Sequence, residues 1–131
     1  MSKNLLRLIH SDLKAAMKRD PAARHYLEII FTYSGFNATF IHRICNLFWR
    51  LKLKFIARLL SSISRILTSI EIHPAAKIDE GFFIDHGAGL VIGETTIIGK
   101  NVTIYQQTTL GGLSPSVDSD SQRNICLLYT S

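Results

Sequence analysis

An aliphatic residue recurs every six positions through the second half of the chain. The recurrence forms two series of four, and the second series is displaced from the first by two residues. Six residues suit one side of a triangular coil, because a short strand with an inward-pointing lead side chain and a turn complete that side. Chance alternation in an ordinary sheet is a poor explanation for two in-phase series, so the period predicts a parallel β-helix. The lead residues are Ile72, Ile78, Ile84 and Leu90, then Ile92, Ile98, Ile104 and Leu110.

The first half of the chain has a helical period instead, because its apolar residues recur at spacings of three and four. Asp20 followed by Pro21 predicts a helix start, since aspartate caps helix N-termini and proline suits the first turn. Ser34-Gly35 is expected to end that helix. After an N-terminal helix, we expect helices over 21–33, 37–51 and 55–70. The fold class is therefore α+β, with a helical bundle over 1–70, β-helix coils over 71–112 and a loop with an irregular tail over 113–131.

Composition narrows the classes of function. Lys and Arg exceed Asp and Glu by 15 to 10, but the basic residues are scattered along the helices rather than forming the stripe that nucleic acid requires. Cys45 and Cys126 lie far apart with no CxxC spacing, so neither a disulfide framework nor a zinc ribbon is expected. Neither a signal peptide nor an apolar run of about twenty residues is visible. We expect a protein of the reducing cytoplasm that binds neither nucleic acid nor membrane.

Three segments resemble the serine O-acetyltransferases of the hexapeptide-repeat acyltransferase family: RDPAARHYLEII, EIHPAAKIDEGFFIDHGAGLVIGET and VTIYQQTTLGG. The resemblance runs from about Lys18 to Gly112. It implies a left-handed coil, although parallel crossovers are usually right-handed. It also implies transfer of acetyl from acetyl-CoA, as a co-substrate with no permanently bound cofactor, to the hydroxyl of L-serine, which gives O-acetylserine for cysteine biosynthesis.

Acetyl transfer to serine needs a general base, because a hydroxyl is a weak nucleophile at neutral pH. Histidine suits this role, and His86 lies beside the two-residue displacement, where a disturbed coil wall lets a side chain face outward. The resemblance implies that His86 is the base. It implies that Glu71, about one coil away, orients the imidazole, as the carboxylate of a catalytic triad does. Many relatives have aspartate at this position, so glutamate keeps the charge but changes its reach.

The resemblance assigns the substrate ammonium group to Asp20 and Asp85. Each also has an ordinary structural explanation, helix capping for Asp20 and a turn for Asp85. Arg123 is the candidate for binding the substrate carboxylate, although Asn124 stands where the family has histidine and no proline follows. The substrate site is therefore expected to hold two carboxylates and one guanidinium.

A metal site is not expected. His73 and His86 could be two ligands of a zinc ion, as in β-helical carbonic anhydrases, but no third histidine lies on a nearby hexad. His73 is better explained as a structural ring, hydrogen-bonded at the start of the coil.

Coenzyme A is expected to bind mostly to the backbone of later coils, and Gly112, at the end of TTLGG, is the candidate contact. The chain then departs from the family pattern, because it continues LSPSVDSDSQRNICLLYTS, in which residues 125–131 fit no hexad. The hexads make about two coils. We therefore expect a β-helix that is incomplete at its C-terminus, and little activity from the chain as given.

Two alternatives remain: another hexapeptide-repeat acyltransferase, or a non-catalytic assembly fragment. Serine is favoured over sugar acceptors because the helical RDPA segment accompanies the coil. A purely structural fragment has no reason to hold His86 and Glu71 about one coil apart. We expect a homotrimer or a dimer of trimers, because the groove beside His86 needs a second coil wall. In a full-length parent, O-acetylserine sulfhydrylase is a further candidate partner.

Overall fold

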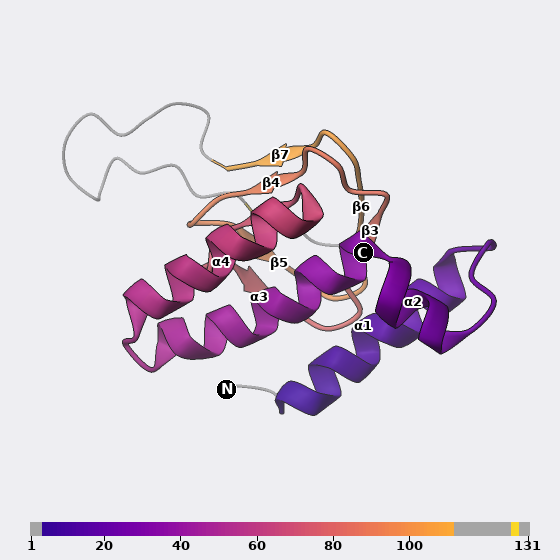
Figure 1. Cartoon of the computed structure of the whole chain (residues 1–131), viewed down its shortest axis with the longest axis horizontal. Helices are drawn as coiled ribbons and strands as arrows, with labels where there is room; N and C mark the ends of the chain where they lie inside the picture. Colours follow the sequence, from indigo (N-terminus) through magenta and orange to yellow (C-terminus); the bar gives the residue numbers. More distant parts are fainter. Residues whose placement is uncertain (1–3, 112–126, 129–131) are drawn as a thin grey trace.

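The computed structural model describes residues 4–111 and 127–128, and these form helices followed by short strands (Figure 1). The helices are α1 (Leu5–Arg19), α2 (Tyr26–Thr32), α3 (Ser34–Arg50) and α4 (Lys54–Thr68). The strands are β1 (Glu71–Ile72), β2 (Lys77–Ile78), β3 (Phe83–Asp85), β4 (Val91–Ile92), β5 (Ile97–Ile98), β6 (Thr103–Tyr105), β7 (Thr109–Leu110) and β8 (Leu127–Leu128). The predicted order, helices before a strand-rich half, is confirmed.

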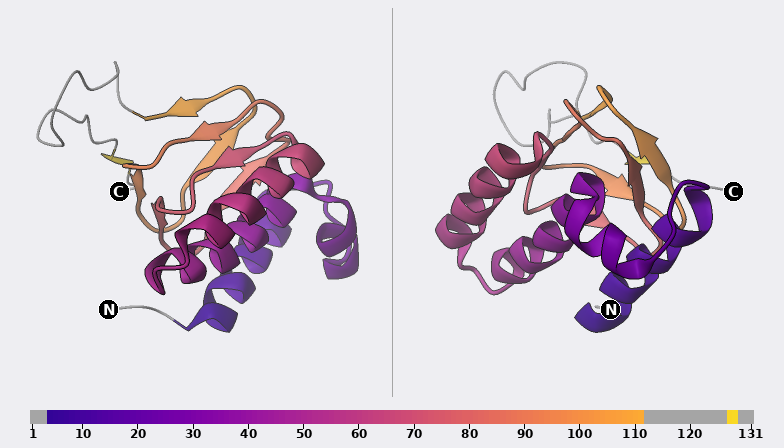
Figure 2. Two further views of the ribbon diagram at one scale, coloured as in Figure 1. Left: turned by 60° about the vertical axis from the view of Figure 1, so that its left-hand side comes forward. Right: turned by 45° about the vertical axis from the view of Figure 1, so that its right-hand side comes forward.

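The strands stack as parallel ladders on the three sides of a coil (Figure 2). Their orders are β1–β4–β7, β2–β5–β8 and β3–β6. Glu71 pairs with Val91, 20 residues further on, whereas Val91 pairs with Thr109, 18 residues further on. The first coil is therefore two residues longer than the second, and the extra length lies in the turn between β3 and β4. This turn explains the displacement between the two hexad series and confirms the predicted parallel β-helix.

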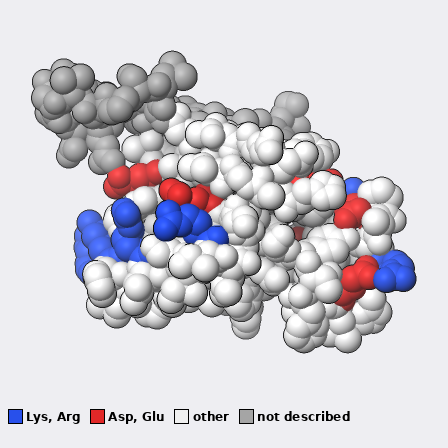
Figure 3. All heavy atoms as spheres, turned by 45° about the horizontal axis from the view of Figure 1, so that its top comes forward, with Lys and Arg blue, Asp and Glu red and all other residues white. Residues whose placement is uncertain are grey.

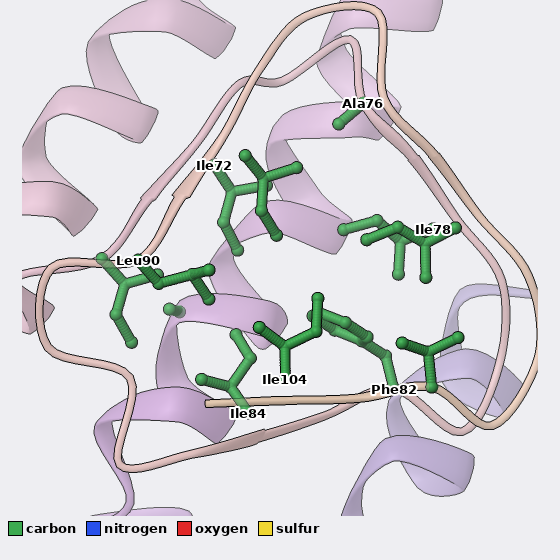
Figure 4. Close-up of a cluster of buried hydrophobic side chains, with 12 residues drawn as sticks. Ile72, Ala76, Ile78, Phe82, Ile84, Leu90 and Ile104 are labelled. Atoms are coloured by element: carbon green, nitrogen blue, oxygen red, sulfur yellow. The ribbon is translucent and has the colours of Figure 1, made fainter. Parts of the chain in front are cut away.

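The lead residues of the hexads fill the inside of the coil (Figure 4). Every lead residue except Leu110 is at most 8% exposed, and Leu110 packs against the others. Phe82 lies four positions after a lead residue and is also buried. The equivalent Ala88 is exposed, because it belongs to the longer turn. Each buried Ile, Leu or Phe side chain contributes about 1.5–3 kcal/mol by leaving water.

The prediction for the tail is wrong at one point. The sequence predicts no coil register for residues 125–131, yet β8 pairs in parallel with β5, with Leu127 opposite Ile97 and Leu128 opposite Ile98. The outer edge of β5 carries backbone donors and acceptors, and these can pair with an extended segment that lacks the hexad pattern.

The helix boundaries around Asp20 also differ from the prediction. The helix expected to begin at Pro21 begins at Tyr26, after an N-cap at His25. Asp20 instead ends α1, and its Oδ1 accepts a hydrogen bond of 2.8 Å from the backbone N–H of Ala22. This is an Asx turn, in which the aspartate side chain bonds to the backbone two residues ahead and competes with helix initiation.

Ser34-Gly35 begins α3 rather than ending α2, and Tyr33 alone separates the two helices. Gly35 is needed for close packing, because a Cβ built there would lie 2.3 Å from the carbonyl oxygen of Ile84 in β3. The glycine therefore lets the first turn of α3 lie directly against β3.

A buried ion pair joins the helices to the coil. The Arg43 guanidinium in α3 contacts the Asp12 carboxylate in α1 through two hydrogen bonds of 3.0 Å. Arg43 also donates to the carbonyl oxygens of Ile78 and Asp79, and Asp12 accepts from the backbone N–H of Phe82. Each charge is thus paired and hydrogen-bonded, as burial requires. The pair sets the position of α1 and α3 on the first coil.

Charged side chains on the face shown in Figure 3 lie in separate groups, with acidic groups beside basic ones. Among the helices of the described residues, none has the length and hydropathy of a membrane span.

Candidate active site

Three of the residues predicted for the site lie around the end of β3. Asp85 is the last residue of this strand, and His86 follows it in the longer turn. The His86 Nε2 atom lies 3.6 Å from Asp85 Oδ1. Asp20 comes from the turn between α1 and α2, and the charge of His86 is among the causes that lower the pKa of Asp20, after its hydrogen bonds to Tyr33 and Ala22. The fold therefore brings Asp20 near Asp85 and His86, two consecutive residues that lie far from it in the sequence.

The turn after β3 holds His86 in an unusual backbone conformation. Its φ is 65°, in the left-handed region, and Gly87 and Gly89 also have positive φ. Non-glycine residues in this region cost on the order of 1 kcal/mol and are concentrated at functional sites. The His86 side chain is 78% exposed, so the ring reaches solvent where a substrate can approach.

Tyr33 is a member of this cluster that the sequence analysis missed. Its hydroxyl donates a hydrogen bond of 2.5 Å to Asp20 Oδ2. This bond, together with burial and the nearby charges of Asp20, Glu28 and Asp85, raises the pKa of Tyr33 to about 12. The sequence offers only a weak signal for Tyr33, a polar aromatic side chain at the expected end of a helix.

Glu71 does not contact His86. Its carboxylate pairs with Arg65 at 3.5 Å, and both side chains are about half exposed, so the pair contributes little stability. The turn that carries His86 stacks on the segment before Glu71, because the Gly89 N–H donates to the carbonyl oxygen of Ser69. Within the described residues, no hydrogen bond joins Glu71 to His86.

His73 has the structural role expected of it. Its Nδ1 accepts a hydrogen bond of 3.0 Å from the backbone N–H of Ala75, and its ring packs edge-on against Trp49 at 5.1 Å. Across the part of the chain that the structure describes, no three His, Cys, Asp or Glu side chains form a group that could hold a metal ion. The other two predicted site residues, Arg123 and Gly112, lie outside the described residues.

Comparison with known proteins gives one consistent family. The family described as "Serine acetyltransferase, N-terminal" matches residues 1–39. The serine acetyltransferase of Bacillus subtilis is 53% identical over 106 residues, which are 81% of this chain and 49% of that protein. The serine acetyltransferase of Staphylococcus aureus strain MSSA476 is 53% identical over 108 residues, 82% of this chain and 50% of that protein. The chain thus spans about half the length of the curated relatives that it matches.

Solved structures agree with the sequence comparisons. Serine acetyltransferase of Neisseria gonorrhoeae in complex with serine superposes with a TM-score of 0.81 and 34% identity, covering 86% of this chain and 47% of that one. A serine acetyltransferase in complex with CoA superposes with a TM-score of 0.80 and 35% identity, covering 82% and 46%. These matches confirm the left-handed β-helix that the resemblance implied. The chain belongs to the serine acetyltransferase family.

Proposed function

We propose that the protein containing this chain transfers an acetyl group from acetyl-CoA to the hydroxyl of L-serine. The observation that carries the proposal is the cluster of Asp20, Asp85 and His86 around the end of β3. It lies on a fold whose solved relatives include complexes with serine and with CoA. Acetyl-CoA acts as a co-substrate, and the products are CoA and O-acetylserine. The O-acetylserine supplies cysteine biosynthesis.

In the proposed mechanism His86 is the general base. It takes the proton of the serine hydroxyl as the oxygen attacks the thioester carbonyl, and the tetrahedral intermediate then expels the CoA sulfur. The imidazolium returns the proton to that sulfur, so His86 ends the cycle neutral. Glu71 would orient the ring after rotating away from Arg65, a small cost for two exposed side chains. Catalytic hydrogen bonds commonly tighten only when substrate is bound.

Substrate binding in this proposal depends on charge. Asp20 and Asp85 bind the ammonium group of serine, and hydrogen bonds, first that from Tyr33, lower the pKa of Asp20 below its ordinary value. Arg123 binds the serine carboxylate, and Gly112 contributes backbone to coenzyme A. These last two roles depend on the resemblance alone.

The proposal includes a cytoplasmic location, supported by the free thiol of the buried Cys45. It also includes delivery of O-acetylserine to a sulfhydrylase, the next enzyme of the pathway.

The test of function is a hybrid enzyme, defined as residues 1–111 joined to the part of the B. subtilis relative that follows its aligned region. Release of free CoA is measured with L-serine and with a panel of other amino acids and sugars. We expect turnover with L-serine well above that with any sugar. Turnover with a sugar alone would favour another hexapeptide-repeat acyltransferase, and no turnover with any acceptor would favour an assembly fragment.

We expect the hybrid enzyme to be a trimer or a pair of trimers. A stripe of apolar side chains on α4 is open to solvent in a single chain, including Phe55, Ile66 and Leu67 at 73–78% exposed, and assembly would bury such a surface. Sedimentation velocity is expected to show the trimer for the hybrid and a monomer after Ile66→Asp with Leu67→Asp. Lys14→Asp, at an exposed position of α1, is the control. A fully active wild-type monomer would contradict the trimer as the functional unit.

A further inference from the structure

We infer that Tyr33 is a positioning residue for the ammonium group of the substrate, because its phenol fixes the Asp20 carboxylate. The inference rests on the proposed function and deepens it by one residue. The bond between the two side chains is short, 2.5 Å from the phenol oxygen to Asp20 Oδ2. Hydrogen bonds to an ionised acceptor are both shorter and stronger than neutral ones.

The backbone of Tyr33 is anchored from both sides. Its N–H donates to the Ile29 carbonyl in α2, at 3.1 Å, and its carbonyl oxygen accepts from the Asn37 N–H in α3, at 3.0 Å. Gly35, two residues after Tyr33, packs against Ile84 of β3, and Ile84 directly precedes Asp85. The backbone that carries the phenol therefore has a fixed position relative to β3, the strand that ends at Asp85.

Both carboxylate oxygens of Asp20 are held. The Ala22 N–H donates to Oδ1 at 2.8 Å, and the Tyr33 hydroxyl donates to Oδ2. A carboxylate oxygen has room for more than one donor, so each oxygen can still accept from a substrate ammonium group. Without the phenol, Asp20 would sit in an exposed turn held by a single backbone bond. Fixing the carboxylate in advance removes an ordering cost from substrate binding.

The charges fit the same arrangement. The hydrogen bond lowers the pKa of Asp20 and raises that of Tyr33 to about 12. At neutral pH the pair therefore keeps one proton on the phenol and one negative charge on Asp20. Asp85 adds a second negative charge nearby, and His86 lies beside it. A cationic group that enters here meets two carboxylates and a base.

The first test needs no substrate. In the 131-residue chain, carbon-13 NMR titration of the Asp20 carboxyl and of the tyrosine rings compares the wild type with Tyr33→Phe and Asp20→Asn. We expect Tyr33→Phe to raise the pKa of Asp20 toward its ordinary value, and Asp20→Asn to lower that of Tyr33 from about 12 toward 10. Tyr26→Phe, which changes an exposed tyrosine of α2, is the control. Unchanged titrations would overturn the hydrogen bond and the inference with it.

The second test measures binding to the hybrid enzyme by isothermal titration calorimetry. The probes are L-serine and 3-hydroxypropionate, which keeps the hydroxyl and carboxylate but lacks the ammonium group. We expect Tyr33→Phe to weaken L-serine binding about tenfold and to leave 3-hydroxypropionate binding unchanged. Loss with Asp20→Asn but not with Tyr33→Phe would overturn the role of Tyr33 and leave the proposed function standing. A wild-type hybrid enzyme that binds no L-serine would contradict the proposed function instead, and the titrations of the first test would still decide whether the hydrogen bond between Tyr33 and Asp20 forms.

Discussion

Replacing His86 with asparagine is expected to lower the turnover of the hybrid enzyme with L-serine by about 10²–10⁴-fold, the usual contribution of a general base. Asparagine cannot take the hydroxyl proton, but among non-glycine residues it is one of the few that accept a left-handed backbone. His86 has a φ of 65°, so asparagine preserves the turn that alanine would strain. We therefore expect the unfolding temperature to be unchanged. Steady-state kinetics and thermal unfolding on the same preparations measure the two quantities.

The matched control is His10→Asn, which changes an exposed histidine of α1 and is expected to keep wild-type turnover. Glu71→Gln is expected to lose less than His86→Asn, because an orienting carboxylate acts only through the base. Wild-type turnover after His86→Asn would show that another group takes the proton. A large loss accompanied by a lower unfolding temperature would assign His86 to folding.

Some of this site could be read from the sequence, because its signal is local. The hexad series predicted the coil, and its displacement marked the turn where His86 leaves the wall. The strand register explains this displacement, because the first coil takes 20 residues and the second takes 18. A hexad period is visible in the sequence when every repeat buries the side chain at the same position, as the lead residues do here.

The rest of the site depends on contacts between distant segments. Asp20 with Pro21 is a strong local signal for a helix start. In the structure, however, the Asp20 carboxylate accepts hydrogen bonds from the Ala22 N–H in an Asx turn and from the Tyr33 hydroxyl. Tyr33 was missed because no sequence spacing relates it to Asp20 or to Asp85. The same limitation applies to Gly35, which a local pattern assigns to a helix end and which packing places within a helix.

Replacing Gly35 with alanine is expected to lower the free energy of unfolding by about 3 kcal/mol, as severe overpacking does. Helix propensity predicts the opposite sign, since alanine exceeds glycine by about 1 kcal/mol inside a helix. Packing prevails because the added Cβ would lie 2.3 Å from the Ile84 carbonyl oxygen and 2.9 Å from the Ile84 Cβ. Neither atom can move without shifting β3 or α3. Chemical denaturation of the 131-residue chain measures the change.

Ser34→Ala is the control for Gly35→Ala, because it raises helix propensity in the same turn without adding a Cβ, and little change in stability is expected. Gly35→Ala is expected to have a second effect, on Tyr33. If α3 moves off β3, Tyr33 moves with it, and its bond to Asp20 lengthens. The tyrosine titration near pH 12 should then shift toward 10 in the folded variant. A stabilised Gly35→Ala chain with an unchanged tyrosine titration would contradict this expectation. It would mean that the contact between α3 and β3 is loose, and that the turn around Tyr33 is enough to orient its side chain toward Asp20.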